Sequence, residues 1–255
     1  MRSSITLRWL LSVPVVAALF MASASHAQSP AIDPEAIGLL KSSTAYVAGL
    51  KRFRVEATSA LELVTVEGQK LQFDQDVAIS VQRPNKMRVD RLGQIVKQTF
   101  FYDGKRLSMI LPTAGFYATV DAPATVDATL DFARDKLGVV APGADLLTTN
   151  SFEVLTNGLT SAIVVGESMV AGVRCDHLAF RNAEVDWQIC IQQGDKPLPR
   201  KLVITSKKMP QAPEFIVVMT KWDTSPSFTD ATFRFTPPKN ARKIDWLPPT
   251  SAATK

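Results

Sequence analysis

Two neighbouring segments with apolar residues at every second position constrain the fold of this chain most strongly. Apolar side chains alternate with polar and charged ones between residues 53 and 63, and the same period returns between residues 71 and 81. A period of two places the apolar side chains of a strand on one face of a sheet. Glu67-Gly68 separates the two segments and favours a turn. The pattern therefore predicts two long antiparallel strands with one buried face.

Further strand patterns follow on both sides of a central helical stretch. Asp103-Gly104 separates two of them and is a strong hairpin signal. Phe233 and Phe235 are predicted to lie in a last strand before a Pro-rich tail. The other predicted strands are Met87 to Arg91, Gln94 to Tyr102, Lys105 to Leu111, Phe116 to Val120, Ile163 to Val170, Val173 to Arg181, Val185 to Gln192, Lys201 to Lys207 and Phe215 to Asp223.

Helical signals precede the strands and interrupt them once. Asp33 followed by Pro34 is typical of a helix start, and Gly49 is typical of its end. A second helical spacing runs from Val126 to Leu137 and stops at Gly138, and a short helical piece is predicted from Ala144 to Leu155. The two helices are the elements available to cover the apolar face of the sheet.

The strand count predicts the fold class. A flat sheet of ten or eleven strands is unfavourable, because accumulated twist makes such a sheet curl or split. We therefore expect a mainly β (α+β) protein with one strongly curved antiparallel sheet, forming an unclosed barrel whose concave face is covered by helices. No linker composition divides the chain, which predicts one domain over residues 28–247 and a flexible tail over residues 248–255.

The first 27 residues carry the three parts of a secretory signal peptide. Arg2 and Arg8 make the start basic, an apolar run follows, and small residues end at Ala27, where cleavage is expected. The alternative is a single amino-terminal membrane anchor, but Pro14 and the shortness of the run disfavour a stable span, which needs about 20 apolar residues. We expect a periplasmic protein that is not integral to the membrane after cleavage.

Cys175 and Cys190 lie on neighbouring predicted strands. A two-residue turn at Asn182-Ala183 would place Cys175 opposite Cys190, on the face that also carries His177. In an oxidising compartment this pair is a disulfide candidate, and two free buried thiols are the alternative. His177 is the one histidine after residue 27, and a strand histidine without converging partners is most simply structural.

The residue types offer little for catalysis or metal binding. Two cysteines and two histidines in 255 residues are too few for a Cys-rich metal site, and no nucleophile elbow or phosphate-binding Gly-rich loop occurs. The pairs Asp74/Asp76 and Asp131/Asp135 are typical of solvated surface. We expect no enzyme activity, no catalytic residues, no metal and no cofactor, and an exported chain of this modest charge predicts no nucleic-acid partner. The basic clusters at residues 51–54 and 207–208 could meet anionic lipid heads, but the pattern favours a solvated sheet edge, where lysine also discourages edge-to-edge pairing.

Six motifs in order along the chain resemble a family of predicted periplasmic proteins described as a domain of unknown function. They are RPNKMR (83–88), FYDGK (101–105), CDHLAF (175–180), DW (186–187), PLPRK (197–201) and FRFTPP (233–238). That family is similar in fold to the lipoprotein carriers LolA and LolB, an unclosed antiparallel barrel with helices over an apolar cavity. The related sensor RseB uses a similar half-barrel. The resemblance implies this fold, and it makes acyl-chain or lipoprotein binding an expectation.

These observations favour a non-enzymatic periplasmic binding or carrier protein that holds an acyl chain, lipid or lipoprotein in an apolar cavity. The alternative is an envelope interaction or sensor protein that uses the half-barrel as a scaffold for a protein partner, and a secreted hydrolase is the third reading. Large apolar side chains on the predicted strands are candidates to line the cavity: Phe53, Phe73, Met87, Met109, Leu178, Phe180, Trp187 and Ile189.

Overall fold

The two long strands predicted from the period of two form the centre of the sheet. In a computed structural model, which describes residues 31–95 and 97–246, they are β1 (Arg52–Val64) and β2 (Lys70–Gln82). They pair antiparallel along their whole length, from Arg52 opposite Gln82 to Val64 opposite Lys70. The predicted signal peptide (1–27) and tail (248–255) lie outside the described residues.

The sheet has twelve strands in the order β12-β6-β5-β4-β3-β2-β1-β11-β10-β9-β8-β7. Two antiparallel meanders meet where β1 pairs with β11. β12 pairs with β6 in parallel, and within the described residues β12 and β7 are the free edges, so the curved sheet stays unclosed. The remaining strands are β3 (Lys86–Gly93), β4 (Lys97–Tyr102), β5 (Arg106–Leu111), β6 (Phe116–Asp121), β7 (Ser161–Val170), β8 (Val173–Arg181), β9 (Val185–Gln192), β10 (Pro199–Ser206), β11 (Glu214–Asp223) and β12 (Arg242–Lys243).

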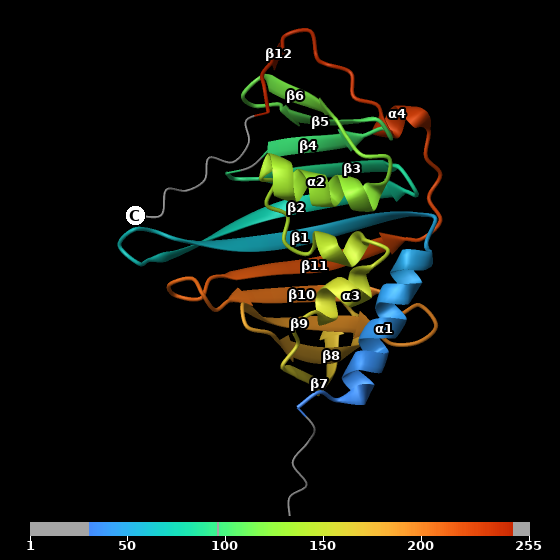
Figure 1. The fold of residues 1–255 in the computed structure, drawn as a ribbon, viewed down its shortest axis with the longest axis vertical. Coiled ribbons are helices and arrows are strands. Elements are labelled where there is room, and N and C mark those ends of the chain that lie inside the picture. Colours follow the sequence, from blue (N-terminus) through green and yellow to red (C-terminus); the bar gives the residue numbers. More distant parts are fainter. Residues whose placement is uncertain (1–30, 96, 247–255) are drawn as a thin grey trace, which may run out of the picture.

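Helical elements cover one face of this sheet, with α2 over the β2–β4 region and α1 over the β7–β10 region (Figure 1). The Asp33 side chain caps α1 by accepting from the backbone N–H of Glu35 at 2.9 Å. Gly138 ends α2 in the left-handed conformation at φ 65°. The helical elements are α1 (Pro34–Gly49), α2 (Val126–Leu137), the 3₁₀ turn η1 (Ala144–Leu147), α3 (Ser151–Thr156) and α4 (Asp230–Phe233).

The main core lies between this helical cover and the concave face of the sheet. Alternate residues of β1 and β2 enter it, as the period of two predicts, and α1 contributes one apolar stripe. No helix among the described residues is long and apolar enough to cross a bilayer. Core residues with less than 2 % exposure include Ala36, Leu40, Val47, Phe53, Val81, Tyr102, Leu107, Val126, Leu178, Ile189, Ile191 and Leu202.

The predicted fold class is confirmed: the protein is mainly β, with one curved, unclosed sheet and helices on its concave face. The sheet has twelve strands, slightly more than the ten or eleven expected, because the short β12 adds to one edge. The helical piece predicted from Ala144 to Leu155 divides into η1 and α3.

The predicted last strand through Phe233 and Phe235 is wrong. A helical turn, α4, begins at Asp230 and ends at Phe233, so Phe233 is not in a strand. Phe233 is buried, with 1 % of its surface exposed. The Phe235 ring packs between Phe101 and Tyr117, with ring centroids 5.5 and 5.3 Å away. Prolines follow, and since proline donates no backbone hydrogen bond, this segment is poorly suited to a sheet ladder.

The predicted register of the β8–β9 hairpin is also wrong, by two residues. Asn182 Oδ1 accepts from the backbone N–H groups of Glu184 and Val185, each at 2.9 Å, so the two turn residues are Ala183 and Glu184. Cys175 therefore lies opposite Gln192, and Cys190 lies opposite His177. An even shift leaves every side chain on its predicted face. Both cysteines are buried as free thiols, so the disulfide is not confirmed.

Candidate ligand cavity

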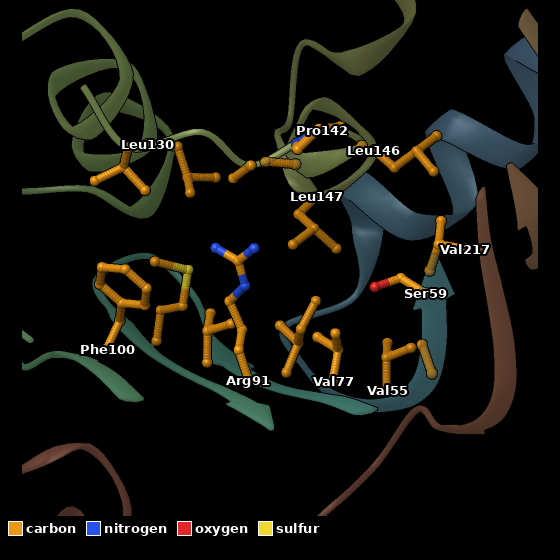
Figure 2. Close-up of a pocket in the computed structure, with 18 of the residues that line it drawn as sticks. Val55, Ser59, Val77, Arg91, Phe100, Leu130, Pro142, Leu146, Leu147 and Val217 are labelled. Atoms are coloured by element: carbon orange, nitrogen blue, oxygen red, sulfur yellow. The ribbon is translucent and has the colours of Figure 1, made fainter. Parts of the chain in front are cut away.

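A cavity of about 140 Å³ lies between the concave face of the sheet and the chain segment from α2 to η1 (Figure 2). Its floor is made by residues of β1, β2, β3 and β11, and its roof by α2, the loop 138–143 and η1. Just over half of the lining side chains are aliphatic: Val55, Ala57, Val77, Ile79, Val89, Leu107, Leu130, Ala133, Val139, Ala141, Ala144, Leu146, Leu147 and Val217.

A second, more open pocket of about 350 Å³ continues from this cavity. The two share six lining residues, which marks them as neighbouring parts of one hollow: Gln75, Arg91, Phe100, Val139, Pro142 and Phe215. Leu61, Met109 and Trp246 belong to the outer part alone. The inner part is therefore an apolar chamber, and the outer part is its mouth.

Small residues leave the space that the two layers enclose. Ala57 and Ser59 on β1 and Ala133 on α2 all border the cavity with small side chains. In the roof, Gly143 has φ 79°, and a Cβ built there would come within 3.0 Å of the Leu202 Cδ2 atom. The positive φ favours glycine at this position, and the close approach to Leu202 adds to that preference.

Arg83, at the end of β2, ties the roof to the sheet. Its Nη2 atom donates to the Leu147 carbonyl at 2.6 Å, and Nη1 lies 3.4 Å from Asp127 Oδ1 on α2. Asp127 Oδ2 accepts in turn from the backbone N–H of Thr149 at 3.0 Å. Burial lowers the pKa of Arg83, and the charge of Asp127 opposes that shift. Arg83 thus holds α2 and η1 over the concave face.

Arg91 is the charged residue of the cavity itself. It rises from β3, and its guanidinium points into the cavity toward Leu147 (Figure 2). Nε donates to Gln75 Oε1 at 3.3 Å, and Nη1 donates to Gln98 Oε1 at 3.0 Å and to the Val140 carbonyl at 3.4 Å. Burial lowers the pKa of Arg91. All three acceptors are neutral, so they orient the guanidinium without neutralising it.

Ser59 supplies a further polar group that is aimed into the cavity (Figure 2). Its side chain is 5 % exposed, and its hydroxyl has no hydrogen-bond partner among the described residues. A buried hydroxyl without a partner costs about 1–3 kcal/mol. The lining residues of both pockets, within residues 31–95 and 97–246, include no carboxylate, histidine or cysteine.

The structure places the eight predicted cavity residues in four environments. Met87 lines the inner cavity, and Met109 lines the mouth. Phe73 lies half-buried on the protruding β1–β2 hairpin, away from both pockets. The remaining five are core residues outside the cavity: Phe53, Leu178, Phe180, Trp187 and Ile189. Phe180 and Trp187 stack on each other, with ring centroids 4.1 Å apart.

Sequence reasoning missed the polar residues of the cavity, although a signal was present. On β3, Arg91 follows Met87 and Val89 with a period of two, so a charge occupies a position where the pattern predicts an apolar side chain. Ser59 interrupts the apolar positions of β1 in the same way. A polar residue at an apolar position of a strand is therefore the sequence signal for this site.

Other candidate groups from the sequence lie away from the cavity. His177 Nε2 is 2.9 Å from Gln188 Oε1 on the neighbouring strand. Asp131 and Asp135 both contact Arg134 on the exposed side of α2. Among the described residues, no group of three His, Cys, Asp or Glu side chains is placed to hold a metal ion. These side chains therefore form ordinary surface contacts.

Several solved structures are similar to this chain. An uncharacterised conserved protein from Thermus thermophilus matches with 12% identity and a TM-score of 0.49, over 83% of this chain and 99% of that one. MucB in its complex with MucA from Pseudomonas aeruginosa matches with 14% identity and a TM-score of 0.44, over 79% of this chain and 61% of that one. A LolA superfamily protein from Nitrosomonas europaea matches with 10% identity and a TM-score of 0.35, over 78% of this chain and 97% of that one.

No curated protein matches the sequence. The family model described as predicted periplasmic protein (DUF2092) matches residues 36–247, which include the helical cover, the sheet and every residue of the cavity described above. This match confirms the family resemblance carried by the six sequence motifs. The chain therefore belongs to the DUF2092 family of predicted periplasmic proteins.

Proposed function

We propose that the protein binds the acyl chain of a lipid or lipoprotein in its cavity and carries it without chemical change. The observation that supports this proposal is the apolar hollow between the sheet and the roof, which continues into an open mouth. An apolar cavity of about 150 Å³ is large enough to bind benzene. The inner chamber is of comparable size, so it suits one end of an alkyl chain whose remainder occupies the mouth.

The residue types around the cavity support binding over catalysis. Acid–base and nucleophilic catalysis use carboxylates, histidine, cysteine or an activated hydroxyl. Of these groups, the lining in the described part of the chain offers the hydroxyls of Ser59 and Thr129, and neither has a general base beside it. An acyl chain, in contrast, needs only apolar walls and an entrance, which the cavity supplies.

We also propose that the protein acts in the periplasm after cleavage at Ala27. The family description and the basic, apolar and small segments of residues 1–27 support this location. The intact mass of the protein isolated from the periplasm tests it. A mature chain beginning at Gln28 is expected, and a retained residue 1–27 segment would contradict cleavage.

Filling the cavity tests the binding function. Ala133 on α2 faces the cavity, whereas Ala128 on the same helix is exposed. We expect Ala133→Phe to weaken binding of a fluorescent fatty acid at least tenfold, because the ring occupies the space of the chain. Ala128→Phe adds the same ring outside the cavity and should bind like the unchanged protein.

Lipid extraction after purification without detergent provides an independent measurement. A co-purified lipid that is absent from Ala133→Phe and present in Ala128→Phe would support the proposal. The absence of lipid from the unchanged protein, together with no binding of the fluorescent fatty acid, would overturn it.

A second candidate function is recognition of an envelope protein. Two exposed apolar side chains favour it: Val140 at the mouth is 69% exposed, and Val66 at the tip of the β1–β2 hairpin is 98% exposed. Under this reading, Val66→Asp should abolish a stoichiometric complex with the partner, and Ala133→Phe should leave the complex intact. The opposite result would favour the acyl-chain function.

A further inference from the structure

Two arginines reach the covered side of the sheet, and they differ in how their charge is balanced. Arg83 has the carboxylate of Asp127 within 3.4 Å and the carbonyl of Leu147 within 2.6 Å. Arg91 has no carboxylate within 4.0 Å among residues 31–95 and 97–246. Arg83 is therefore a structural ion pair, whereas Arg91 is a cation without a counter-ion in an apolar hollow.

The contacts of Arg91 leave one edge of its guanidinium available. Gln75 accepts from Nε, and Gln98 and the Val140 carbonyl accept from Nη1, which accounts for three of its five N–H groups. Among the described residues, Nη2 has no acceptor. Its two N–H groups are held in place by the bonds of the neighbouring nitrogens, which is the arrangement that binds an anionic oxygen with little loss of side-chain freedom.

Polar side chains follow a diagonal across four strands of the sheet, since Gln75 lies opposite Gly93 and Arg91 lies opposite Val77. Ser59 on β1 lies opposite Gln75 on β2, and Arg91 on β3 lies opposite Gln98 on β4. Gln75 joins the two pairs by its bond to Arg91 Nε. Arg91 and Gln75 line both the inner chamber and the mouth. Arg91 and Gln75 therefore mark the neck between the two parts of the hollow, and Ser59 lies on its inner side.

We propose that Arg91 and Ser59 bind the anionic head group of an amphiphile, a carboxylate or a phosphate, whose alkyl chain lies in the inner chamber. This inference rests on the proposed acyl-chain function and adds the chemical class of the ligand. The Arg91 guanidinium donates through Nη2, and the unpartnered Ser59 hydroxyl donates to the same group. The chain then extends from the neck between Val77 and Leu147 into the apolar interior.

Desolvation explains why the site favours an anion over a neutral polar group. A cation taken from water into an apolar site is unfavourable unless it is paired. Burial acts on Arg91 in this direction, since it lowers the pKa of Arg91, and no neighbouring charge compensates. An anionic ligand supplies the missing counter-charge, and it also satisfies the Ser59 hydroxyl.

Displacement of the neutral dye Nile red by three ten-carbon amphiphiles tests the inference. Decanoate and decyl phosphate carry anionic heads, and decanol carries a neutral one. We expect the unchanged protein to bind at least one anionic amphiphile about tenfold more tightly than decanol, which corresponds to one charge-assisted hydrogen-bonding pair. The comparison of decanoate with decyl phosphate identifies which anion the site prefers.

Three variants test whether the preference for an anionic amphiphile depends on Arg91 and Ser59. Arg91→Gln should weaken binding of the anionic amphiphiles about tenfold more than binding of decanol, and so remove the preference. Ser59→Ala, which removes a hydroxyl without a partner, should fold normally and reduce anion binding about threefold. Arg88→Gln is the matched control, because Arg88 lies on the same strand but on the opposite face, where it pairs with Asp90. It should retain the full preference.

The outcomes separate this inference from the function on which it rests. Equal binding of all three amphiphiles, or an unchanged preference in Arg91→Gln, would overturn the head-group site and leave the acyl-chain function standing. Binding of none of the three would overturn both. Loss of decanol binding in Arg91→Gln would also count against the site, since it would assign Arg91 to the structure of the cavity alone.

Discussion

At the scale of single residues, the fold depends on a few charged groups with more than one partner. Arg83 is the clearest case, because it contacts Asp127 on α2 and the Leu147 carbonyl in η1 from its place at the end of β2. Its side chain is 8% exposed, and its buried Nε atom has no partner among the residues that the structure describes. The bonds made by this one residue therefore position most of the cavity roof.

Removal of the Arg83 guanidinium should loosen the roof. We expect Arg83→Met to lower the free energy of unfolding by about 2 kcal/mol, because it removes the donor of the Leu147 carbonyl and the counter-charge of the Asp127 carboxylate. Urea denaturation followed by circular dichroism measures the change. Arg88→Met is the control, since it breaks an exposed ion pair that contributes less than about 1 kcal/mol. Equal effects of the two changes would contradict the role assigned to Arg83.

Asp186 gives the protein a predicted dependence on acid pH. Hydrogen bonds from Arg181, at 2.8 and 2.7 Å, lower the pKa of Asp186 to about 2, and Lys207 adds to the shift. A pKa below the unfolded value of about 3.9 stabilises the folded state above that pH, and this contribution is lost as the pH falls toward 2.

Substitution of Asp186 isolates this contribution. Asp186→Asn should be less stable than the unchanged protein at pH 6, by less than about 1 kcal/mol because the pair is partly exposed. The difference should shrink between pH 5 and pH 2 in unfolding experiments. A difference that is constant across this range would show that the carboxylate charge contributes nothing.

At the scale of elements, caps and turns decided how well local structure could be predicted. Asp33 begins α1 and Gly138 ends α2 where the sequence predicts. Both predictions hold because a cap depends on backbone groups that are close to it in the chain. The β8–β9 turn depends on Asn182, whose side chain accepts from two backbone N–H groups and moves the turn by one residue. The buried face of the hairpin was still predicted correctly, because the resulting register shift is even.

This register predicts the chemical state of Cys175 and Cys190. The two residues are diagonal neighbours across the strands, a geometry less suited to a disulfide than direct opposition. Burial raises the pKa of Cys175 to about 11, and the neighbouring Cys190 adds to the shift, so its thiol is protonated at neutral pH.

We therefore expect iodoacetamide to label Cys175 slowly in the folded protein and to label both cysteines after denaturation without reductant. Mass spectrometry counts the labels, and a sample reduced before labelling is the control. Two labels only after reduction would instead demonstrate the disulfide.

At the scale of the whole molecule, the chain path makes one unit of the two meanders. After β6 the chain crosses the concave face through α2, η1 and α3 and reaches the far edge of the sheet at β7. It then returns strand by strand to β11, which pairs with β1. The helical crossing is also the roof of the cavity. The core cluster extends under it from β8 and β9 to β4 and β5.

A shared core predicts a single cooperative unfolding transition. Trp187 reports on the β9 side of the core, and Trp246 packs beside Phe100 on the β4 side, with ring centroids 6.2 Å apart. In a Trp222→Phe background, variants that retain Trp187 or Trp246 should give the same urea midpoint by fluorescence. Two separate midpoints would show that the meanders unfold independently and would contradict a single domain.

The sequence by itself determined the strand faces, the ends of the two longer helices and the family, because these depend on neighbours along the chain and on short motifs. Only the tertiary structure decided which apolar side chains fill the core and which border the cavity. Met87 and Phe53 look alike in the alternating pattern, yet one lines the hollow and the other is packed beside it. The role of Arg91 was decided in the same way, because the absence of a carboxylate beside it depends on packing between distant elements. The local sequence pattern determines the face of the sheet on which a side chain lies. Packing between elements that are distant in the sequence determines which groups contact it there.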